Sequence, residues 1–153
     1  MCIRDSNWSG ELGPGVSAKD MALKMCAALG MDAGQYQAIQ YYGDTITALD
    51  IFERMTLCNM AAELGAQAGL IEPDAKTAAY IRDAGSDPGN WDLFKGDADA
   101  RVAVTHNFDA RALAPQVAAP HSPANADDAA SVEKVEIDQF YICLLYTSPS
   151  PRD

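Results

Sequence analysis

Apolar residues recur at helical spacing between Ser17 and Gly30, and this is the clearest structural signal in the chain. Ser17 is a favourable N-cap, the acidic Asp20 follows three residues later, and Gly30 is a typical helix stop. We interpret Cys26 as a small buried core residue, because it lies on the apolar side of this helix. The apolar stripe consists of Met21, Ala22, Met25, Cys26 and Leu29.

Three other segments have the pattern of β-strands. Residues 38–42 form a short apolar run that ends at the turn signal Gly43-Asp44. Weaker strand patterns lie at residues 9–12 and 101–104. Strands and helices therefore follow one another along the chain.

Two more helices are expected after the first turn. Thr47, with Asp50 three residues later, repeats the capping pattern before a helical region that extends to about Ala68. Asp74, which follows a proline, is expected to cap a helix over residues 75–83.

The last third of the chain changes in composition. Residues 112–130 are rich in Ala, Pro, Asp and Ser and have neither helical nor strand period, which is typical of a linker. Residues 132–142 alternate and then become apolar, as expected for a buried strand. In α/β folds, loops at the carboxyl ends of such strands commonly carry the active site.

The two ends of the chain are related through their coding DNA. Residues 1–6 can be encoded by ATG TGT ATA AGA GAC AG plus one base, and the reverse complement of this DNA encodes Cys-Leu-Leu-Tyr-Thr, the residues at 143–147. A natural gene has no reason to end on the reverse complement of its own start. We therefore interpret residues 1–6 and 143–153 as sequencing-adapter scars and exclude them from the expected fold.

Charge and cysteine content exclude several classes of function. The net charge of −11 argues against binding to a nucleic-acid backbone, which relies on clustered Lys and Arg. No apolar run approaches the roughly 20 residues that a membrane-spanning helix needs. Cys26 and Cys58 form no Cys-x-x-Cys pair and no Cys/His ligand spacing, so no metal site is expected in this chain. Reduced cysteines are consistent with a cytoplasmic protein.

The segment with the most chemical content runs from residue 53 to residue 67. On a continuous helix, Leu57, Met60, Ala61 and Leu64 would form an apolar face, whereas Asn59, Glu63 and Gln67, spaced four apart, would share another. A carboxylate and an amide beside small residues can serve polar recognition or proton transfer. Taken alone, however, the pattern is more typical of a solvated polar stripe.

The same segment resembles a known family. Residues 56–66, Thr-Leu-Cys-Asn-Met-Ala-Ala-Glu-Leu-Gly-Ala, resemble the Thr-x-Cys-Asn-Met-x-x-Glu-x-Gly-Ala motif of the aconitase superfamily. The flanking Glu-Arg-Met at 53–55 and Gln-Ala-Gly-Leu-Ile-Glu-Pro-Asp at 67–74 are most similar to large subunits of isopropylmalate dehydratase. Further matches occur in family order across residues 7–142, which makes the resemblance specific.

The resemblance implies an architecture for the chain. It predicts an α/β fold, a fragment of the three-layer α/β/α fold of aconitase large subunits. Residues 7–118 would form a domain like the second aconitase domain, and residues 119–142 would be a linker and the first strand of the next domain. That strand would lead into the family's Gly-Ser-Cys loop.

The resemblance also implies a function. The parent protein would be a hydro-lyase that isomerises a 2-alkylmalate, converting 2-isopropylmalate to 3-isopropylmalate in leucine biosynthesis, at a four-iron–four-sulfur cluster and together with a small subunit. Glu63 would hydrogen-bond the departing hydroxyl or water, and Asn59 would lie beside the cluster and the substrate. The cluster ligands fall outside this chain, so the fragment is expected to bind no cluster and to be inactive.

Two alternatives remain open. The parent could be an aconitate hydratase or a homoaconitase, or a cluster-free binding domain on the same scaffold. Many large subunits have Gly-Gly-Thr-Gly where residues 33–36 of this chain are Ala-Gly-Gln-Tyr, which is closer to the homoaconitase-like branch. This departure leaves open which 2-hydroxy acid is the substrate.

Overall fold

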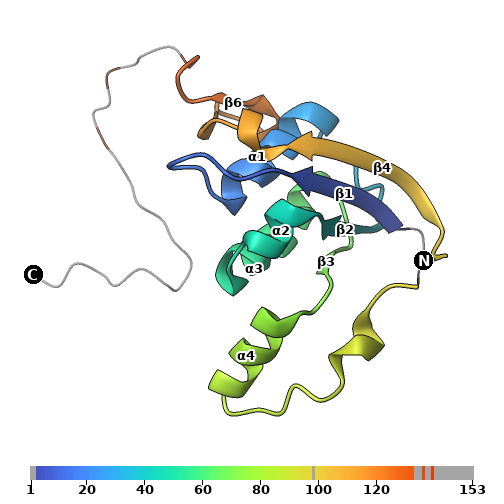
Figure 1. Cartoon of the computed structure of the whole chain (residues 1–153). Coiled ribbons are helices and arrows are strands. Elements are labelled where there is room, and N and C mark those ends of the chain that lie inside the picture. The colour runs from blue at the N-terminus through green and yellow to red at the C-terminus, as the bar shows by residue number, and fades with distance from the viewer. Residues whose placement is uncertain (1–2, 98, 133–135, 137–138, 140–153) are drawn as a thin grey trace, which may run out of the picture.

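A computed structural model describes residues 3–97, 99–132, 136 and 139 of the chain. Its central feature is a sheet of four parallel strands in the order β3-β2-β1-β4 (Figure 1). The α/β fold class expected from the sequence is confirmed. The strands are β1 (Ile3–Ser9), β2 (Ala38–Tyr42), β3 (Ala68–Ile71) and β4 (Val102–Asp109).

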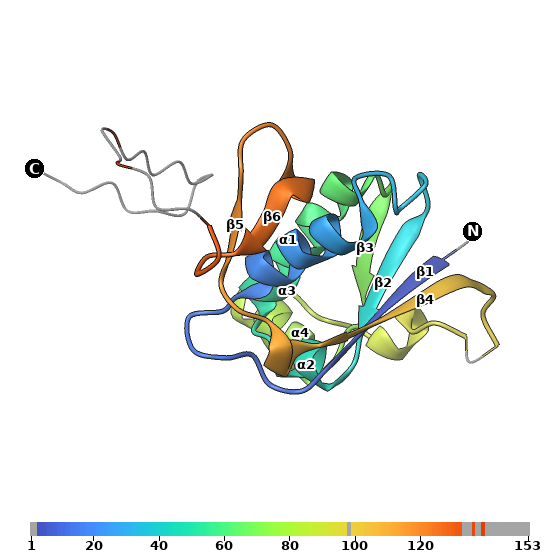
Figure 2. The ribbon, with the colours of Figure 1, turned by 90° about the horizontal axis from the view of Figure 1, so that it is seen from above.

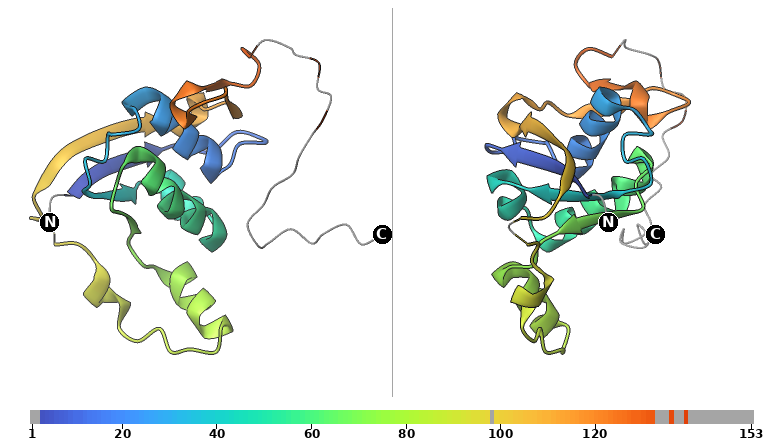
Figure 3. Two further views of the ribbon diagram at one scale, coloured as in Figure 1. Left: turned by 180° about the vertical axis from the view of Figure 1, so that it is seen from behind. Right: turned by 90° about the vertical axis from the view of Figure 1, so that its right-hand side faces the viewer.

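Helices α1 (Ala18–Leu29) and α3 (Ile51–Asn59) pack side by side on one face of this sheet (Figures 2 and 3). The short helix α2 (Asp44–Ala48) connects β2 to α3, and α4 (Ala75–Asp83) lies beyond the β3 edge. Four 3₁₀ turns complete the described helical elements: η1 (Met60–Leu64), η2 (Trp91–Phe94), η3 (Ala110–Ala112) and η4 (Pro123–Asn125). In the parts that the model describes, no helix is long and apolar enough to span a membrane.

The first helix forms as its sequence predicts. Ser17 is the N-cap of α1, its amide donates to the Asp20 carboxylate at 2.8 Å, and Gly30 is the C-cap. The side chains of the predicted apolar stripe are buried, except for the half-buried Leu29. The interpretation of Cys26 as a core residue is confirmed, because its exposed fraction is 0%.

Strand β1 lies at the centre of the core and differs from its prediction. The strand ends at Ser9, and the next residue, Gly10, turns the backbone with a φ of 89°. The prediction of a strand over residues 9–12 is therefore wrong. Trp8 on this strand is buried and stacks on Phe108 of β4 with ring centroids 4.6 Å apart. Residues 3–6 form the first half of β1, while their interpretation as an adapter scar stays a prediction.

The prediction of one long helical region that extends to about Ala68 is also wrong. The chain forms α2, a break at Leu49, then α3 and η1, and it has already entered β3 at Ala68. Asp50, rather than Thr47, is the N-cap of α3, and its carboxylate accepts from the Glu53 amide at 2.8 Å. The helix over residues 75–83 with its Asp74 cap is confirmed.

Residues 112–130 are not the irregular linker that their composition suggests. They contain β5 (Gln116–Ala118) and β6 (Ala126–Asp128), an antiparallel pair that packs against α1 (Figure 1). The Gln116 amide donates to Asp20 of α1 at 2.8 Å, which fixes the pair to the helix. The domain boundary expected after residue 118 falls within this pair and stays a prediction.

Two other strand predictions have different outcomes. The strand expected at 101–104 is longer than predicted, because β4 continues to Asp109. Most of the strand expected at 132–142, and all of the second scar at 143–153, lie outside the described residues.

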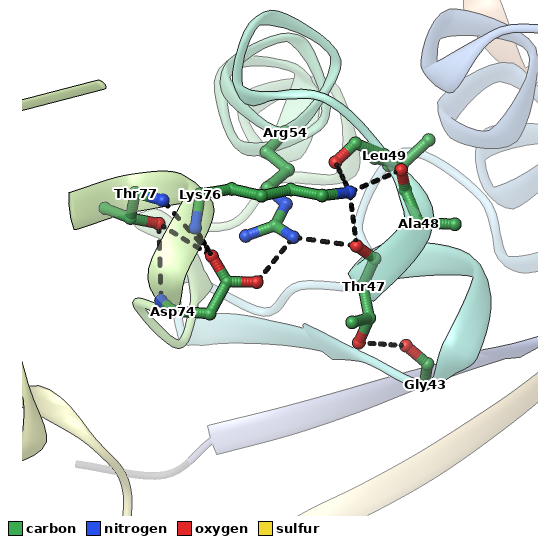
Figure 4. A network of polar contacts seen from close by, with 8 residues as sticks. All are labelled: Gly43, Thr47, Ala48, Leu49, Arg54, Asp74, Lys76 and Thr77. Carbon is green, nitrogen blue, oxygen red and sulfur yellow. Dashed lines mark hydrogen bonds and ion pairs between the residues drawn. The ribbon is translucent and has the colours of Figure 1, made fainter. Parts of the chain in front are cut away.

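A polar network fixes the start of α3 and α4 relative to α2 (Figure 4). Arg54, only 4% exposed, donates through Nη2 to the Thr47 carbonyl at 3.0 Å and to Asp74 Oδ2 at 2.7 Å. Lys76 Nζ donates to the carbonyl oxygens of Thr47, Ala48 and Leu49 at the end of α2. Asp74 in turn accepts from the Lys76 amide and so caps α4.

The other end of α3 lies against the sheet through direct backbone contact. A Cβ on Gly69 of β3 would lie 2.7 Å from both Cα and the carbonyl oxygen of Cys58. Both atoms belong to the backbone, so they cannot move without displacing α3. The absence of a side chain at Gly69 therefore sets the distance between α3 and β3.

We expect Asp74→Asn to lower the free energy of unfolding at pH 7 by about 1–2 kcal/mol, a range that discounts the pKa shift for the partial exposure of this carboxylate. The hydrogen bond from Arg54, with further help from two amides, lowers the pKa of Asp74 from 3.8 to about 2. Its contribution is complete above pH 4 and is lost as the pH falls from 4 to 2. Urea unfolding at a series of pH values would measure the difference between variant and wild type.

The control is Asp83→Asn, an exposed carboxylate at the end of the same helix. It should change stability by less than about 0.5 kcal/mol. An Asp74→Asn penalty that persists at pH 2 would contradict the assigned ion pair.

We expect Gly69→Ala to lower the free energy of unfolding by about 1–3 kcal/mol, because the new methyl group overlaps the Cys58 backbone. Gly13→Ala is a matched control, since a Cβ there would meet its nearest neighbour, a Val16 methyl, at 3.9 Å. Thermal unfolding of both variants would test this, and equal midpoints would show that α3 shifts without cost.

Candidate active-site segment

The two candidate residues lie at the edge of the sheet where β2 and β3 begin. Asn59 is the last residue of α3 and Glu63 belongs to η1, and both side chains are exposed. Gly65 then adopts a left-handed conformation with a φ of 68°, which ends η1 and directs the chain into β3. The position of Glu63 therefore depends on how η1 is held.

The turn that precedes β2 holds η1 in place. The Gly34 amide donates to the Leu64 carbonyl at 2.6 Å, and the Tyr36 amide donates to the Gly65 carbonyl at 2.9 Å. The approach is so close that a Cβ on Gly34 would lie 2.6 Å from the Ala66 nitrogen. Backbone atoms on both sides of this contact fix the residues that follow Glu63.

The shared polar face predicted for residues 59, 63 and 67 does not form as expected. After Asn59 the helix tightens to 3₁₀ geometry. A residue four positions on is then rotated by about 80° more than in an α-helix, because each residue turns about 120° rather than 100°. Gln67 lies beyond the Gly65 cap, and its amide donates to the Gln37 carbonyl at 2.9 Å.

The apolar side of the segment follows the prediction more closely. Leu57, Ala61 and Leu64 have exposed fractions of 0%, 1% and 0%. Met60, predicted on the same face, is half-buried and packs at the margin of the core. These contacts leave Asn59 and Glu63 on the outer surface of a well-packed element.

The two cysteines near this segment are packed thiols. Burial, followed by the negative charge of Glu63, raises the pKa of Cys26, and burial raises the pKa of Cys58 to about 11. Neither thiol forms a disulfide, and both are protonated at neutral pH because their pKa values are raised above 9. Neither thiol belongs to a group of three metal-ligating side chains within the described residues, so the two cysteines do not fit the three-cysteine ligand set of the family's cluster.

The other potential metal ligands of the described chain are also scattered. Across residues 3–97 and 99–132, no three His, Cys, Asp or Glu side chains are grouped to hold an ion. His106 lies in β4 and is half-buried. His121 lies in a turn with a φ of 85° and is exposed.

A cavity of about 390 Å³ lies at the opposite edge of the sheet, beside the carboxyl ends of β2 and β3. Its lining includes Tyr42, Glu72 and Trp91, together with the Arg54–Asp74 ion pair. No sequence motif marked this cavity. It is separated from Glu63 by the length of α3, which runs from one edge of the sheet to the other.

The sequence analysis also missed the backbone conformation of the turn before β2. Gln35 and Tyr36 have φ angles of 43° and 57°, in the left-handed region. Residues other than glycine adopt this region at a cost of roughly 1 kcal/mol or more. The Ala-Gly-Gln-Tyr departure at residues 33–36 was the available signal, since many large subunits have glycine at the position of Tyr36.

Comparison with known proteins identifies the family. The model of the aconitase family (aconitate hydratase) matches residues 4–140. The 3-isopropylmalate dehydratase large subunit 1 of Methanopyrus kandleri is 40% identical over 134 residues, which is 88% of this chain and 32% of that protein. The large subunit of Sulfurihydrogenibium sp. is 39% identical over 127 residues, 83% of this chain and 29% of that protein.

A third relative, the 3-isopropylmalate dehydratase large subunit 1 of Archaeoglobus fulgidus, is 38% identical over 136 residues, 89% of this chain and 32% of that protein. The chain thus spans about a third of the length of the curated relatives that it matches. The family match covers most of the described fold, including the segment that carries Asn59 and Glu63. This chain belongs to the aconitase family.

Proposed function

We propose that this chain is a segment of the large subunit of a hydro-lyase that converts 2-isopropylmalate to 3-isopropylmalate in leucine biosynthesis. The observation that carries the proposal is the presentation of Glu63, an exposed carboxylate on a backbone fixed by Gly34 and Gly65. The names of the relatives support the substrate, since each is a 3-isopropylmalate dehydratase large subunit.

Glu63 suits the proton transfer that this reaction requires. Dehydration breaks a C–O bond and a neighbouring C–H bond, forms a C=C bond and releases water. Hydroxide leaves poorly unless an acid protonates it, and we assign this proton to the Glu63 carboxyl group. When water adds back at the adjacent carbon, the Glu63 carboxylate takes the proton, and the Asn59 amide orients the substrate beside it.

The remaining chemistry belongs to parts of the enzyme outside this chain. By family resemblance, a four-iron–four-sulfur cluster in the parent would act as a Lewis acid on the hydroxyl group. The residues that the structure describes do not supply its ligands. The base that removes the carbon-bound proton would come from a small subunit, whose existence the large-subunit names of the relatives imply.

We also infer that the parent enzyme is cytoplasmic, which agrees with the free thiols of Cys26 and Cys58 among the described residues. An aconitate hydratase or homoaconitase is the second candidate. The departure from glycine at Tyr36 favours it, because this turn lies against the segment that carries Glu63. A cluster-free binding domain is the third, and the complete gene would distinguish it by lacking a Gly-Ser-Cys loop after residue 142 and a later Cys-x-x-Cys.

We expect the isolated 153-residue chain to assemble no cluster and to turn over no hydroxy acid. Its described cysteines are protonated and packed, and no three ligands converge within the described residues. Anaerobic incubation with iron and sulfide, followed by visible absorption spectroscopy, tests this expectation. A stable charge-transfer band that survives desalting would show it to be wrong.

In the intact enzyme, we expect Glu63→Gln to lower kcat by about 10²–10⁴-fold, the usual contribution of a general acid–base group. Glutamine keeps the size and the hydrogen-bonding reach of the side chain but removes the titratable proton. Steady-state kinetics with 2-isopropylmalate, together with iron content and the thermal midpoint, would separate catalysis from folding.

Glu53→Gln is the control, because Glu53 is a glutamate in the first turn of α3, at the other end of the α3–η1 segment from Glu63. It should leave turnover unchanged. If Glu63→Gln keeps full turnover, the residue is only part of a solvated polar stripe. If it loses cluster or solubility instead, its role is structural.

A further inference from the structure

The cavity at the carboxyl ends of β2 and β3 has the size and the position of a small-molecule site. Its volume of about 390 Å³ lies within the range of cavities that hold small ligands. In open α/β sheets, ligands commonly bind outside the carboxyl ends of parallel strands. The proposed catalysis gives this cavity no role, because Glu63 precedes β3 and lies at the other edge of the sheet.

Arg54 supplies the lining with a buried positive group that has unused donors. It is only 4% exposed, and both hydrogen bonds found for its guanidinium leave from Nη2, to Thr47 and to Asp74 (Figure 4). Its buried Nε–H has no acceptor within the described residues, and no bond from Nη1 is found there. A buried donor without an acceptor costs free energy, so this group favours a ligand that carries a carboxylate.

Glu72 supplies the opposite charge. Its Oε1 accepts from the Gly96 amide at 2.9 Å and from the Gln40 side chain at 3.2 Å, which fixes the carboxylate beyond the end of β3. None of the hydrogen bonds found for Glu72 within the described residues uses Oε2. Lys95, the other cation of the lining, is paired with Asp92 at 2.6 Å. Glu72 therefore keeps one oxygen for the ammonium group of a ligand.

The formal charges of the lining cancel. Arg54 and Lys95 are matched by Glu72 and Asp74, which are the charged side chains around the cavity. A ligand with a net charge of either sign gains little from such a lining. A zwitterion can meet both signs at once, which makes it the electrostatically complementary partner.

Apolar side chains form much of the remaining wall. Tyr42 is 38% exposed, Ile71 and Trp91 are half-buried, and Ile46 is buried. Two of these four side chains are aromatic, and aromatic rings gain stabilisation from stacked or edge-to-face contact with another ring. The wall therefore favours a ligand with a large apolar side chain, an aromatic one in particular.

We propose that this cavity binds a free α-amino acid with a large apolar side chain. The carboxylate of the ligand faces Arg54, its ammonium group faces Glu72, and its side chain packs against Tyr42 and Trp91. Because the site and Glu63 lie at opposite edges of the sheet, binding here does not depend on the proposed hydro-lyase reaction.

Isothermal titration calorimetry of the 153-residue chain tests the site with ligands that share one ring. The ligands are phenylalanine, phenethylamine, which lacks the carboxylate, and 3-phenylpropionate, which lacks the ammonium group. Phenylalanine should bind about tenfold more tightly than either fragment, because each lost group leaves a charged partner unsatisfied. Alanine, which keeps both charges but no ring, should also bind about tenfold more weakly.

Glu72→Gln tests the assigned acid, since glutamine can still accept from the Gly96 amide but carries no charge. It should weaken the binding of phenylalanine about tenfold and should not weaken that of 3-phenylpropionate. Glu63→Gln, the same substitution at the other edge of the sheet, is the matched control and should leave every affinity unchanged. Thermal unfolding of both variants checks that the fold persists.

The outcomes that overturn the site are distinct. A folded wild-type chain that takes up no phenylalanine at millimolar concentration overturns it, and so does a fragment that binds as tightly as phenylalanine. Both results need only the wild-type chain, so they decide even if Glu72→Gln unfolds. Unchanged phenylalanine binding in a folded Glu72→Gln, or its loss in Glu63→Gln, would show that the ligand binds elsewhere.

Discussion

The structure depends on the close packing of the α3–η1 segment against its neighbours without intervening side chains. Gly69 of β3 and Gly34 of the preceding turn bring backbone to within 2.7 Å and 2.6 Å of where their Cβ atoms would be. Such contacts leave little freedom for adjustment, because backbone atoms cannot change rotamer. The segment that carries Asn59 and Glu63 is therefore positioned by main-chain geometry, and the polar side chains on it are free to serve a ligand.

The two ends of α3 are held by different physical forces. At its start, Arg54 and Asp74 form a charged network with the end of α2, whose strength depends on pH. At its end, the contacts are backbone hydrogen bonds and steric fit, which do not depend on the titration of a side chain. A helix anchored at both ends transmits little motion, which suits an element that leads into the segment of the proposed catalytic carboxylate.

The face of the sheet opposite α1 and α3 is polar. The Asn7 side chain donates to Asn107 at 3.0 Å, and Gln40 donates to Glu72 at 3.2 Å, so neighbouring strands are joined by side-chain hydrogen bonds on this face. Any element that packs on this face meets paired amide and carboxylate groups. The polar pairs predict a hydrogen-bonded, hydrated contact there rather than an apolar one.

The sequence by itself determined what local chemistry controls. The caps at Ser17 and Asp74, the apolar stripe of α1 and the strand at 38–42 follow from neighbouring residues, and all of them form. The family motif identified Asn59 and Glu63 as candidates, although their roles stay predictions. The elements that the sequence did not predict are held by long-range contacts. After Asn59, η1 is joined to the turn at Gly34 by a backbone hydrogen bond, and the strand pair within residues 116–128 is held to α1 through Asp20 and Lys24. The left-handed conformation of Tyr36 was likewise set by a bond to Gly65, twenty-nine positions further along the chain, which no local pattern of residues encodes.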